Sequence, residues 1–433
     1  AILIVLLTSL IGVVDAQQIL PFENSNEAQR SQTITNPFKE FVPQQNVSAA
    51  KGSEIINEYT FSGGMVYNSN YENRTFDVLS IPKFSALSEP GKPSLPVHID
   101  NVFIPGNARV SIEILEAETT TFPNFYIQPA LTPAKDTEGD DERQFVMDHK
   151  VYNTDAFFPA KPVFIKSEQF LRGNKLASVA VVPVQFNPVT QTIKVYTRIK
   201  YKVNYSGGKS FNDLQQDNSD HYLKMFRNVA LNSAQIPKAS ANTRTSNNNS
   251  DYIIITHNDY IGAADSLAKW KNMLGYSTEI ISSSSWTAAM VKDSIHTRYQ
   301  NSTPKPDYFV IIGDHGDVPA EIHQTPSGEN FGTDLYYACM DGTGDYVPDM
   351  AHGRISVSSS TEALNVIQKI IDYEQNPVSD PSFYNKGTNC AYYQGYESGG
   401  HTYTSRRFVH TSEEIRSYLT GKGYNVDRIY TTD

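Results

Sequence analysis

The chain has 433 residues, a formal net charge of −11 and two cysteines. This length exceeds what one hydrophobic core usually organises, so we expect at least two domains. Binding to nucleic acid or to an anionic membrane needs a basic face, and the acidic balance therefore argues against both kinds of partner. Two cysteines cannot build a disulfide framework or a zinc ribbon.

Residues 1–16 form an apolar run that ends in Ala16 and is followed by two glutamines. The pattern predicts the hydrophobic region of a secretory signal peptide, cleaved after Ala16. A transmembrane anchor is the alternative, but the run is shorter than the ~20 apolar residues that span a bilayer. No later segment qualifies as a membrane span. We therefore expect a secreted or cell-surface protein, with a polar and flexible lead over residues 17–54.

Residues 55–232 contain short runs of alternating apolar and polar residues, broken by Pro, Gly and Asn. The clearest run, 193–205, predicts a half-buried antiparallel strand, and it forms a hairpin with the run at 179–188. No segment shows a long period of 3.6 residues. An all-β domain, either a sandwich or a barrel, is therefore expected. Its acidic insert at 136–142 lacks the ligand spacing of a calcium loop and is interpreted as a solvated loop.

Residues 233–250 have no apolar period and are rich in Ser, Asn, Thr and Ala. This composition predicts an exposed linker between two domains. Lys238 and Arg244 lie within it, so the linker is also the expected region of proteolytic cleavage.

From residue 251 to residue 433, short apolar strands alternate with amphipathic helices. Strands that are apolar on both faces are typical of parallel sheets covered by helices on both sides. We expect a three-layer, doubly wound α/β domain with a mainly parallel sheet that is incomplete at Asp433. Its expected strands are 251–256, 277–282, 307–314, 389–394 and 425–430.

Chemistry in an open parallel sheet is expected beyond the carboxyl ends of the strands. The loop at 313–317 brackets His315 with Asp314 and Asp317, but turn and helix-capping roles are the favoured interpretation of both carboxylates. The loop at 332–356 carries Asp341, Asp345 and Asp349, which are weak calcium candidates. An acidic surface loop is the favoured alternative for these three residues.

Motifs for nucleotide binding and for serine hydrolases are absent, since the chain has no GxGxxG after its first apolar strand, no GxxxxGK[ST] and no GxSxG. Cys339 is a conceivable nucleophile, with His315 or His352 as its base, but an inert packed thiol is favoured. Cys390 lies in the middle of an expected strand and is assigned to the core. We expect both thiols to be unpaired and buried, and the residues alone show no complete catalytic set.

Several segments of the second half resemble the catalytic domain of the gingipain-type cysteine peptidases, family C25, which have a caspase-like fold. The resemblance rests on DYIIIT, LAKWKNMLGY, DYFVIIGDHGDVP, TDLYYACMDGTGDYVPDMAHGRIS, KIIDYEQ and GYNVDRIY, in this order. The first half, with GKPSLPV followed by a β-rich region, is similar to the prodomain of these enzymes. The resemblance implies a zymogen of a secreted cysteine endopeptidase that acts on protein or peptide substrates and whose prodomain binds its own catalytic domain. It implies no required cofactor, with structural Ca²⁺ as an option.

In this family the catalytic His and Cys lie at the ends of the two strands that follow the segment resembling 423–430, so the resemblance places both beyond Asp433. An acidic residue that orients the His is expected near the fourth strand, where Glu397 is the nearest carboxylate, although Glu397 is also consistent with an ordinary surface residue. Two other functions remain open. One is a non-catalytic family member associated with secretion or the cell surface, and the other is a β-rich adhesin or glycan-binding protein.

Overall fold

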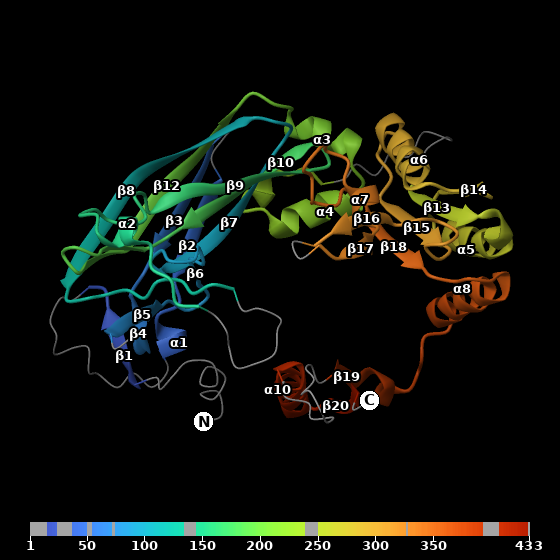
Figure 1. Cartoon of the computed structure of the whole chain (residues 1–433). Helices are drawn as coiled ribbons and strands as arrows, with labels where there is room; N and C mark the ends of the chain where they lie inside the picture. Colours follow the sequence, from blue (N-terminus) through green and yellow to red (C-terminus); the bar gives the residue numbers. More distant parts are fainter. Residues whose placement is uncertain are drawn as a thin grey trace.

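The computed structural model describes residues 15–23, 37–49, 54–71, 74–133, 144–238, 250–325, 328–392 and 407–431. Two regions are evident in Figure 1, a β-rich part up to residue 238 and an α/β part from residue 250. The predicted signal segment 1–16 lies outside the described residues except for Asp15 and Ala16, where the first strand begins.

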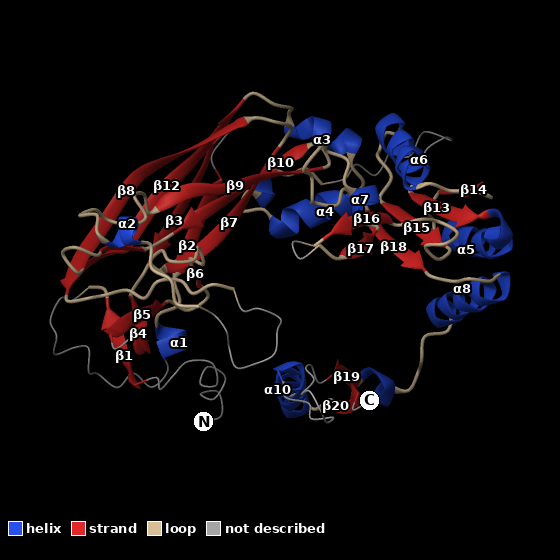
Figure 2. Cartoon of the chain, in the orientation of Figure 1, coloured by secondary structure: helices blue, strands red, loops and turns tan. Residues whose placement is uncertain are grey.

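The β-rich part is built mainly of antiparallel strands (Figure 2). The strands are β1 (Asp15–Pro21), β2 (Gln44–Ala49), β3 (Glu54–Thr60), β4 (Gly63–Tyr71), β5 (Arg74–Ser80), β6 (Ser85–Ala86), β7 (Pro96–Ile104), β8 (Arg109–Pro123), β9 (Val163–Leu171), β10 (Asn174–Val181), β11 (Val184–Asn187) and β12 (Thr192–Ser206). The helices are α1 (Pro37–Glu40), α2 (His149–Tyr152), α3 (Phe211–Asp217) and α4 (Asp220–Val229), followed by a 3₁₀ turn, η2 (Ser233–Gln235).

Three sheets result, with strand orders β1-β4-β5, β6-β7-β10-β9 and β11-β12-β3-β2, and β8 pairs along β12. The two larger sheets share one hydrophobic core, to which β7 contributes Val97, β10 contributes Val179 and β12 contributes Ile193 and Val203. Strand β12 follows the predicted alternation, because its apolar residues are buried while Arg198, Lys200 and Lys202 lie on the other face. The predicted hairpin is confirmed for β11 and β12, which pair antiparallel from Val184–Val195 to Asn187–Thr192.

The prediction of a flexible lead over 17–54 is wrong for the described part of that range. Strand β2 pairs with β3, and β1 pairs with β4, so both add to sheets of the β-rich part. These strands are held by backbone hydrogen bonds. The polar residues of β2 give no apolar alternation that would reveal such pairing from the sequence.

The expectation that residues 55–232 contain only strands is also wrong, because α3 and α4 follow the last strand. Helix α4 buries Tyr222, Leu223 and Phe226, and the ring of Phe226 stacks on that of Phe103 at 4.3 Å. The predicted linker starts too early as well. Ile236 is buried in the same cluster as Phe226, so the β-rich part extends through residue 238.

The α/β part contains a four-stranded parallel sheet in the order β14-β13-β15-β18, with helices on both faces. Its strands are β13 (Tyr252–His257), β14 (Thr278–Ser283), β15 (Tyr308–Ile312) and β18 (Ala351–Ile355), and β16 (Glu321–Gln324) forms a separate antiparallel pair with β17 (Asn330–Thr333). A 3₁₀ turn, η3 (Asn258–Tyr260), precedes the helices α5 (Ile261–Met273), α6 (Ala288–Asn301), α7 (Leu335–Ala338), α8 (Ser360–Gln375), α9 (Pro381–Tyr384) and α10 (Arg407–Gly421).

Strand β13 shows how the helices cover both faces of this sheet. Ile253 and Ile255 pack with Val291 and Ile295 of α6, while Ile254 packs on the other face with residues of α5 and α8. A strand buried on both faces has the continuous apolar sequence from which the parallel sheet was predicted.

Two parts of the predicted strand arrangement are wrong. Strand β18 lies in the range expected to be a long loop, and it pairs parallel with β15. Strands β19 (Lys386–Tyr392) and β20 (Asn425–Thr431) pair parallel with each other rather than extending the four-stranded sheet. Figure 1 shows them with α10, apart from that sheet. Apolar periodicity locates strands but does not determine their partners.

Candidate functional site

The turn between β9 and β10 brings a buried arginine from the β-rich part into the α/β part. Arg172 and Gly173 form this two-residue turn, with φ angles of 55° and 70°. Such left-handed pairs suit the twist of a hairpin, and Asn or Asp followed by Gly is the usual sequence. Arg172 is only 2% exposed. In Figure 1 this end of β10 lies beside α3 and close to α7.

The guanidinium of Arg172 lies between groups of both parts. Its Nε donates to Oδ1 of Asn218 at 2.8 Å within the β-rich part. Its two terminal nitrogens donate to carbonyl oxygens of the α/β part, those of Lys305 (3.1 Å), Pro306 (3.1 Å) and Asp349 (2.9 Å). The guanidinium carbon also lies 3.9 Å from the centre of the Tyr222 ring, a cation–π contact.

The same turn contacts the acidic loop, which we define as residues Asp341–Asp349. The backbone N–H of Gly173 donates to Oδ2 of Asp341 at 3.0 Å, and the backbone N–H of Arg172 donates to Oδ1 of Asp349. Asp349 is fully buried. Burial, followed by the nearby carboxylate of Asp341, raises the pKa of Asp349 to about 7. The acidic loop is therefore partly built into the contact between the two parts and is not simply a surface loop.

The three carboxylates named from the sequence as calcium candidates do come together. One ligand atom from each of Asp341, Asp345 and Asp349 lies within 4.8 Å of the others. These oxygens are the ligand type that Ca²⁺ prefers, and each carboxylate keeps lone pairs besides those used by backbone donors. Burial, and after it the neighbouring carboxylates, raises the pKa of Asp349 and of Asp341, and the convergence of three carboxylates fits a hard cation.

The contact lies at the amino edge of the parallel sheet. Asp307 immediately precedes β15, and Asp349 lies two residues before β18. The opposite, carboxyl edge carries the loop at 313–317. There Asp314 accepts a local hydrogen bond from the His315 backbone N–H (2.8 Å), as the predicted turn role requires, whereas Asp317 accepts one from the distant Tyr260 hydroxyl (2.6 Å).

Arg354 fixes the same carboxyl edge. Its guanidinium forms a bidentate pair with Asp334, at 2.8 and 2.7 Å, and donates to the carbonyls of Gly313 and Val318. Its hydrogen bonds therefore tie the loop after β15 to the region before α7, and no described side chain there forms a nucleophile–base pair with a thiol.

The surroundings of Cys339 disfavour its action as a nucleophile. Burial, and then the carboxylates of Asp345 and Asp349, raise the pKa of Cys339 to about 11, which disfavours its thiolate. Both thiols are unpaired, as expected, but Cys390 is exposed, so its assignment to the core is wrong. The reason is that residues of β19 alternate between half-buried and exposed, and Cys390 lies on the exposed face. Glu397 and Arg244 lie outside the described residues, and Lys238 is exposed at the end of the β-rich part.

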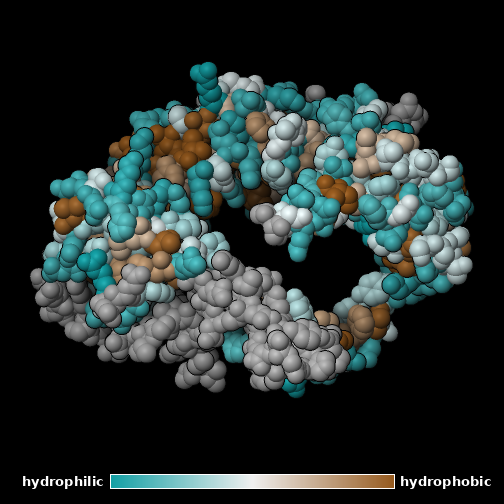
Figure 3. All heavy atoms as spheres, in the orientation of Figure 1, coloured by the Kyte–Doolittle hydropathy of each residue, from teal (hydrophilic) through white to brown (hydrophobic). Residues whose placement is uncertain are grey.

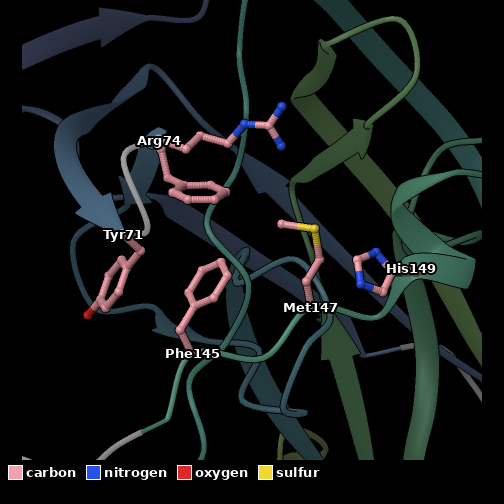
Figure 4. Close-up of a pocket in the computed structure, with 6 residues that line it drawn as sticks. Tyr71, Arg74, Phe145, Met147 and His149 are labelled. Carbon is pink, nitrogen blue, oxygen red and sulfur yellow. The ribbon is translucent and has the colours of Figure 1, made fainter.

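A cavity of about 430 Å³ lies in the β-rich part and is lined by Tyr71, Arg74, Phe76, Phe145, Met147 and His149 (Figure 4). The rings of Tyr71 and Phe145 stack on each other at 5.2 Å, and Phe145 packs against Phe76 at 5.4 Å. Arg74 donates to the hydroxyl of Tyr126 at 2.9 Å. The ring faces are thus largely used within the protein, and the lining supplies no thiol or carboxylate for peptide hydrolysis.

Sequence reasoning missed Arg172, Asn218 and Asp307, although the segment Leu171–Asn174, with Arg-Gly between two β runs, carries a hairpin signal. From the sequence alone, an arginine at this position is expected to be an exposed turn residue. Its burial depends on the α/β part, more than 130 positions away in the sequence, which local patterns do not report.

Comparison with known proteins assigns a family to both parts. Residues 245–433 match the model of peptidase family C25, and residues 43–230 match the model of the C25 propeptide. Three similar proteins of Porphyromonas gingivalis are Gingipain R1 (25% identical, covering 78% of this chain and 33% of the relative), Gingipain R2 (24%, covering 80% and 47%) and Lys-gingipain (22%, covering 99% and 24%). The chain spans between about a fifth and about half of the length of the curated relatives that it matches.

Solved structures with similarity to this chain include a complex of the pro- and mature domains of RgpB from Porphyromonas gingivalis (20% identity, TM-score 0.39, covering 44% of this chain and 98% of that chain). A second is a structure concerned with the zymogenic latency of gingipain K (15% identity, TM-score 0.37, covering 45% and 100%). The two C25 matches leave out only residues 1–42 and 231–244. The chain therefore belongs to the gingipain-type cysteine peptidases of family C25, with the propeptide of that family preceding its peptidase segment.

Proposed function

We propose that the protein is the zymogen of a secreted, caspase-like cysteine endopeptidase that acts on proteins or peptides. The β-rich part would serve as the propeptide, and the α/β part would begin the peptidase domain. The observation that carries this proposal is the order of the two family matches, together with the insertion of Arg172 from the propeptide segment into the peptidase segment. No helix among the described residues is long and apolar enough to span a membrane.

The chemistry proposed is thiol catalysis. A histidine beside a cysteine favours the thiolate, which attacks the peptide carbonyl while backbone amides stabilise the oxyanion. The resemblance to the C25 peptidases implies a catalytic His and Cys after the segment 423–430, and Cys339 is buried, so we place the catalytic pair outside residues 1–433. Glu397 is proposed to orient that histidine.

The test uses a longer form of the protein that includes the residues following Asp433. We expect it to cleave reporter peptides after removal of the β-rich part, with loss of cleavage on treatment with a thiol alkylator. Cys339→Ala is the matched control, and it should leave the rate unchanged. A longer form that never cleaves although its two parts associate would instead support a non-catalytic member of the family.

Structural Ca²⁺ is proposed at Asp341, Asp345 and Asp349. A cation would offset the negative charge of these three carboxylates, so millimolar Ca²⁺ should raise the Tm of the wild-type chain relative to a chelator. Mg²⁺ should raise it less, because Mg²⁺ demands near-ideal octahedral geometry and loses its water reluctantly. The same comparison on Asp345→Asn should show a much reduced shift. Equal Tm values with Ca²⁺ and with chelator would exclude the site.

A further inference from the structure

The conformation of Arg172 points to a role beyond forming a turn. Its φ of 55° is one that residues with a Cβ adopt at a free-energy cost, and glycine or asparagine would normally occupy this position. Strain of this kind persists where the surrounding contacts compensate for it. The contacts of Arg172 are therefore the place to look for its function.

The contacts satisfy the guanidinium almost completely and are shared between the two parts. One acceptor, Asn218, belongs to the β-rich part, and three carbonyl acceptors belong to the α/β part. The planar guanidinium donates in several directions at once, which the ammonium of lysine cannot do in the same geometry. The side chain therefore binds backbone carbonyl groups that lie just before the first residues of β15 and β18.

The buried carboxylate of Asp307, in the α/β part, has the guanidinium of Arg172 as its nearby cation. Its Oδ1 has no hydrogen-bond partner among the residues that the structure describes, and this oxygen lies 3.6 Å from a terminal nitrogen of Arg172. Burial raises the pKa of Asp307, and the charge of Arg172 opposes the rise. Removal of the guanidinium would leave a buried carboxylate without its cation.

Further contacts surround Arg172 on the α3–α4 side. The backbone N–H of Lys305 donates to the carbonyl of Asp217 at 3.1 Å, and the rings of His221 and Tyr308 lie 5.6 Å apart. Val347 of the acidic loop packs against the apolar cluster that contains Leu171 and Phe226. A well-packed rim around a buried arginine is the usual arrangement of a binding hot spot.

We propose that Arg172 anchors the β-rich part to the amino edge of the peptidase sheet, and that this anchor, rather than the covalent joint, holds the two parts together once the chain is cut between them. The inference rests on the proposed propeptide role of the β-rich part. It places control of propeptide release at the edge of the sheet opposite the carboxyl ends of the strands. Cleavage of the joint alone is then insufficient for release.

The experiment uses the whole chain with a recognition sequence for a site-specific protease placed in residues 239–249. After complete cleavage, gel filtration over a range of concentrations measures whether the two pieces co-elute. We expect the wild-type pieces to stay together, whereas Arg172→Gly and Arg172→Ala weaken the association by roughly 100-fold. Arg172→Lys should restore little of it. Gln191→Ala is the matched control, because Gln191 also has a positive φ (52°) in an exposed hairpin turn within the β-rich part.

Arg172→Gly separates anchoring from a role in the turn. Glycine relieves the backbone strain, so the β-rich piece of this variant should unfold at the same temperature as the wild-type piece or at a higher one, while its association is lost. Co-elution of the cut Arg172→Gly pieces at wild-type concentrations would overturn the proposal. That result would leave the peptidase assignment intact, since the assignment depends on thiol-sensitive cleavage by the longer form and not on association.

Discussion

At the scale of single residues, the environment of each thiol determines its chemistry. Cys339 is buried between α7 and the acidic loop, where its own carbonyl accepts a hydrogen bond from Lys292, and nearby carboxylates disfavour the thiolate. Cys390 is exposed on β19. Two residues of the same type in one chain are therefore expected to differ in reactivity because of their surroundings.

Alkylation should separate the two thiols. At about pH 8 in the native protein, iodoacetamide should modify Cys390 rapidly and Cys339 slowly, because thiolate is the reacting form and the pKa of Cys339 is about 11. The rate at Cys339 should rise as the pH approaches that pKa, or on unfolding in urea. Peptide mass spectrometry measures both rates, and Cys390→Ser isolates the slower one. Rapid native labelling of Cys339 would contradict its assignment as an inert thiol.

At the scale of elements, charge pairing covers the outer face of β12. Arg198, Lys200 and Lys202 alternate with the buried residues of this strand and pair with glutamates of β3 and β8, including Arg198 with Glu58 at 2.7 Å and Lys200 with Glu116 at 3.0 Å. The hydrogen bond from Arg198 lowers the pKa of Glu58, and the one from Lys202 lowers the pKa of Glu113. The strand is thus polar outside and apolar inside, as its alternation predicts.

This face should make stability depend on acid pH. Because the folded pKa values of Glu58, Glu113 and Glu116 are lowered, their pairing stabilises the fold above the unfolded pKa of about 4.5 and is lost as the pH falls through the lower folded values. The Tm of the first unfolding transition should fall between about pH 5 and pH 3, and less steeply in Glu113→Gln/Glu116→Gln. Calorimetry measures the slopes, and equal slopes would show that these pairs contribute nothing measurable.

The joint between the two parts is the element expected to be cut first. Lys238 is exposed where the β-rich part ends, and the next described residue is Ser250. Limited trypsin digestion of the chain should therefore cleave first after Lys238 or Arg244, as N-terminal sequencing of the fragments would show. Lys238→Gln/Arg244→Gln should delay this cleavage. First cuts within β3–β12 would mean that the domain boundary is misplaced.

At the scale of the whole molecule, the propeptide segment contacts the peptidase segment at the amino edge of the parallel sheet. The visible face of both parts is mainly hydrophilic, with hydrophobic residues in separate patches (Figure 3). The contact around Arg172 lies at the amino edge of the four-stranded sheet, whereas the proposed catalytic residues would follow β20, which pairs with β19 and not with that sheet. Such a separation would allow association to be altered without changing the residues that carry out catalysis.

The 433-residue chain by itself should be inactive. The buried thiol of Cys339 has a raised pKa, and the exposed thiol of Cys390 lies on β19, to which we assign no catalytic role. We therefore expect no thiol-dependent hydrolysis of Arg, Lys or acidic reporter peptides, before or after cleavage of the joint. A fluorogenic peptide assay with and without a thiol alkylator measures this, and Cys339→Ala serves as the control. Alkylator-sensitive turnover that is lost in Cys339→Ala would restore Cys339 as the nucleophile.

The amino-acid sequence alone determined the features that follow from the residue pattern of a short segment or from the order of similar segments. The apolar run of β13 predicted a strand buried on both faces, the alternation in β12 predicted its hairpin with β11, and the order of the C25-like segments predicted the family. The two strand signals each span only a few residues, within which side-chain spacing follows backbone geometry directly. The three acidic candidates were found as residue types, but not their convergence.

Only the tertiary structure decided which distant segments meet. It paired β18 with β15, paired β19 with β20, added the polar strand β2 to a sheet, and exposed Cys390. It also buried Arg172 among carbonyl groups of the α/β part, where the sequence shows only an Arg-Gly turn. The physical reason is that strand pairing and the burial of a charge depend on backbone groups, which every residue carries alike, and on partners far away in the chain.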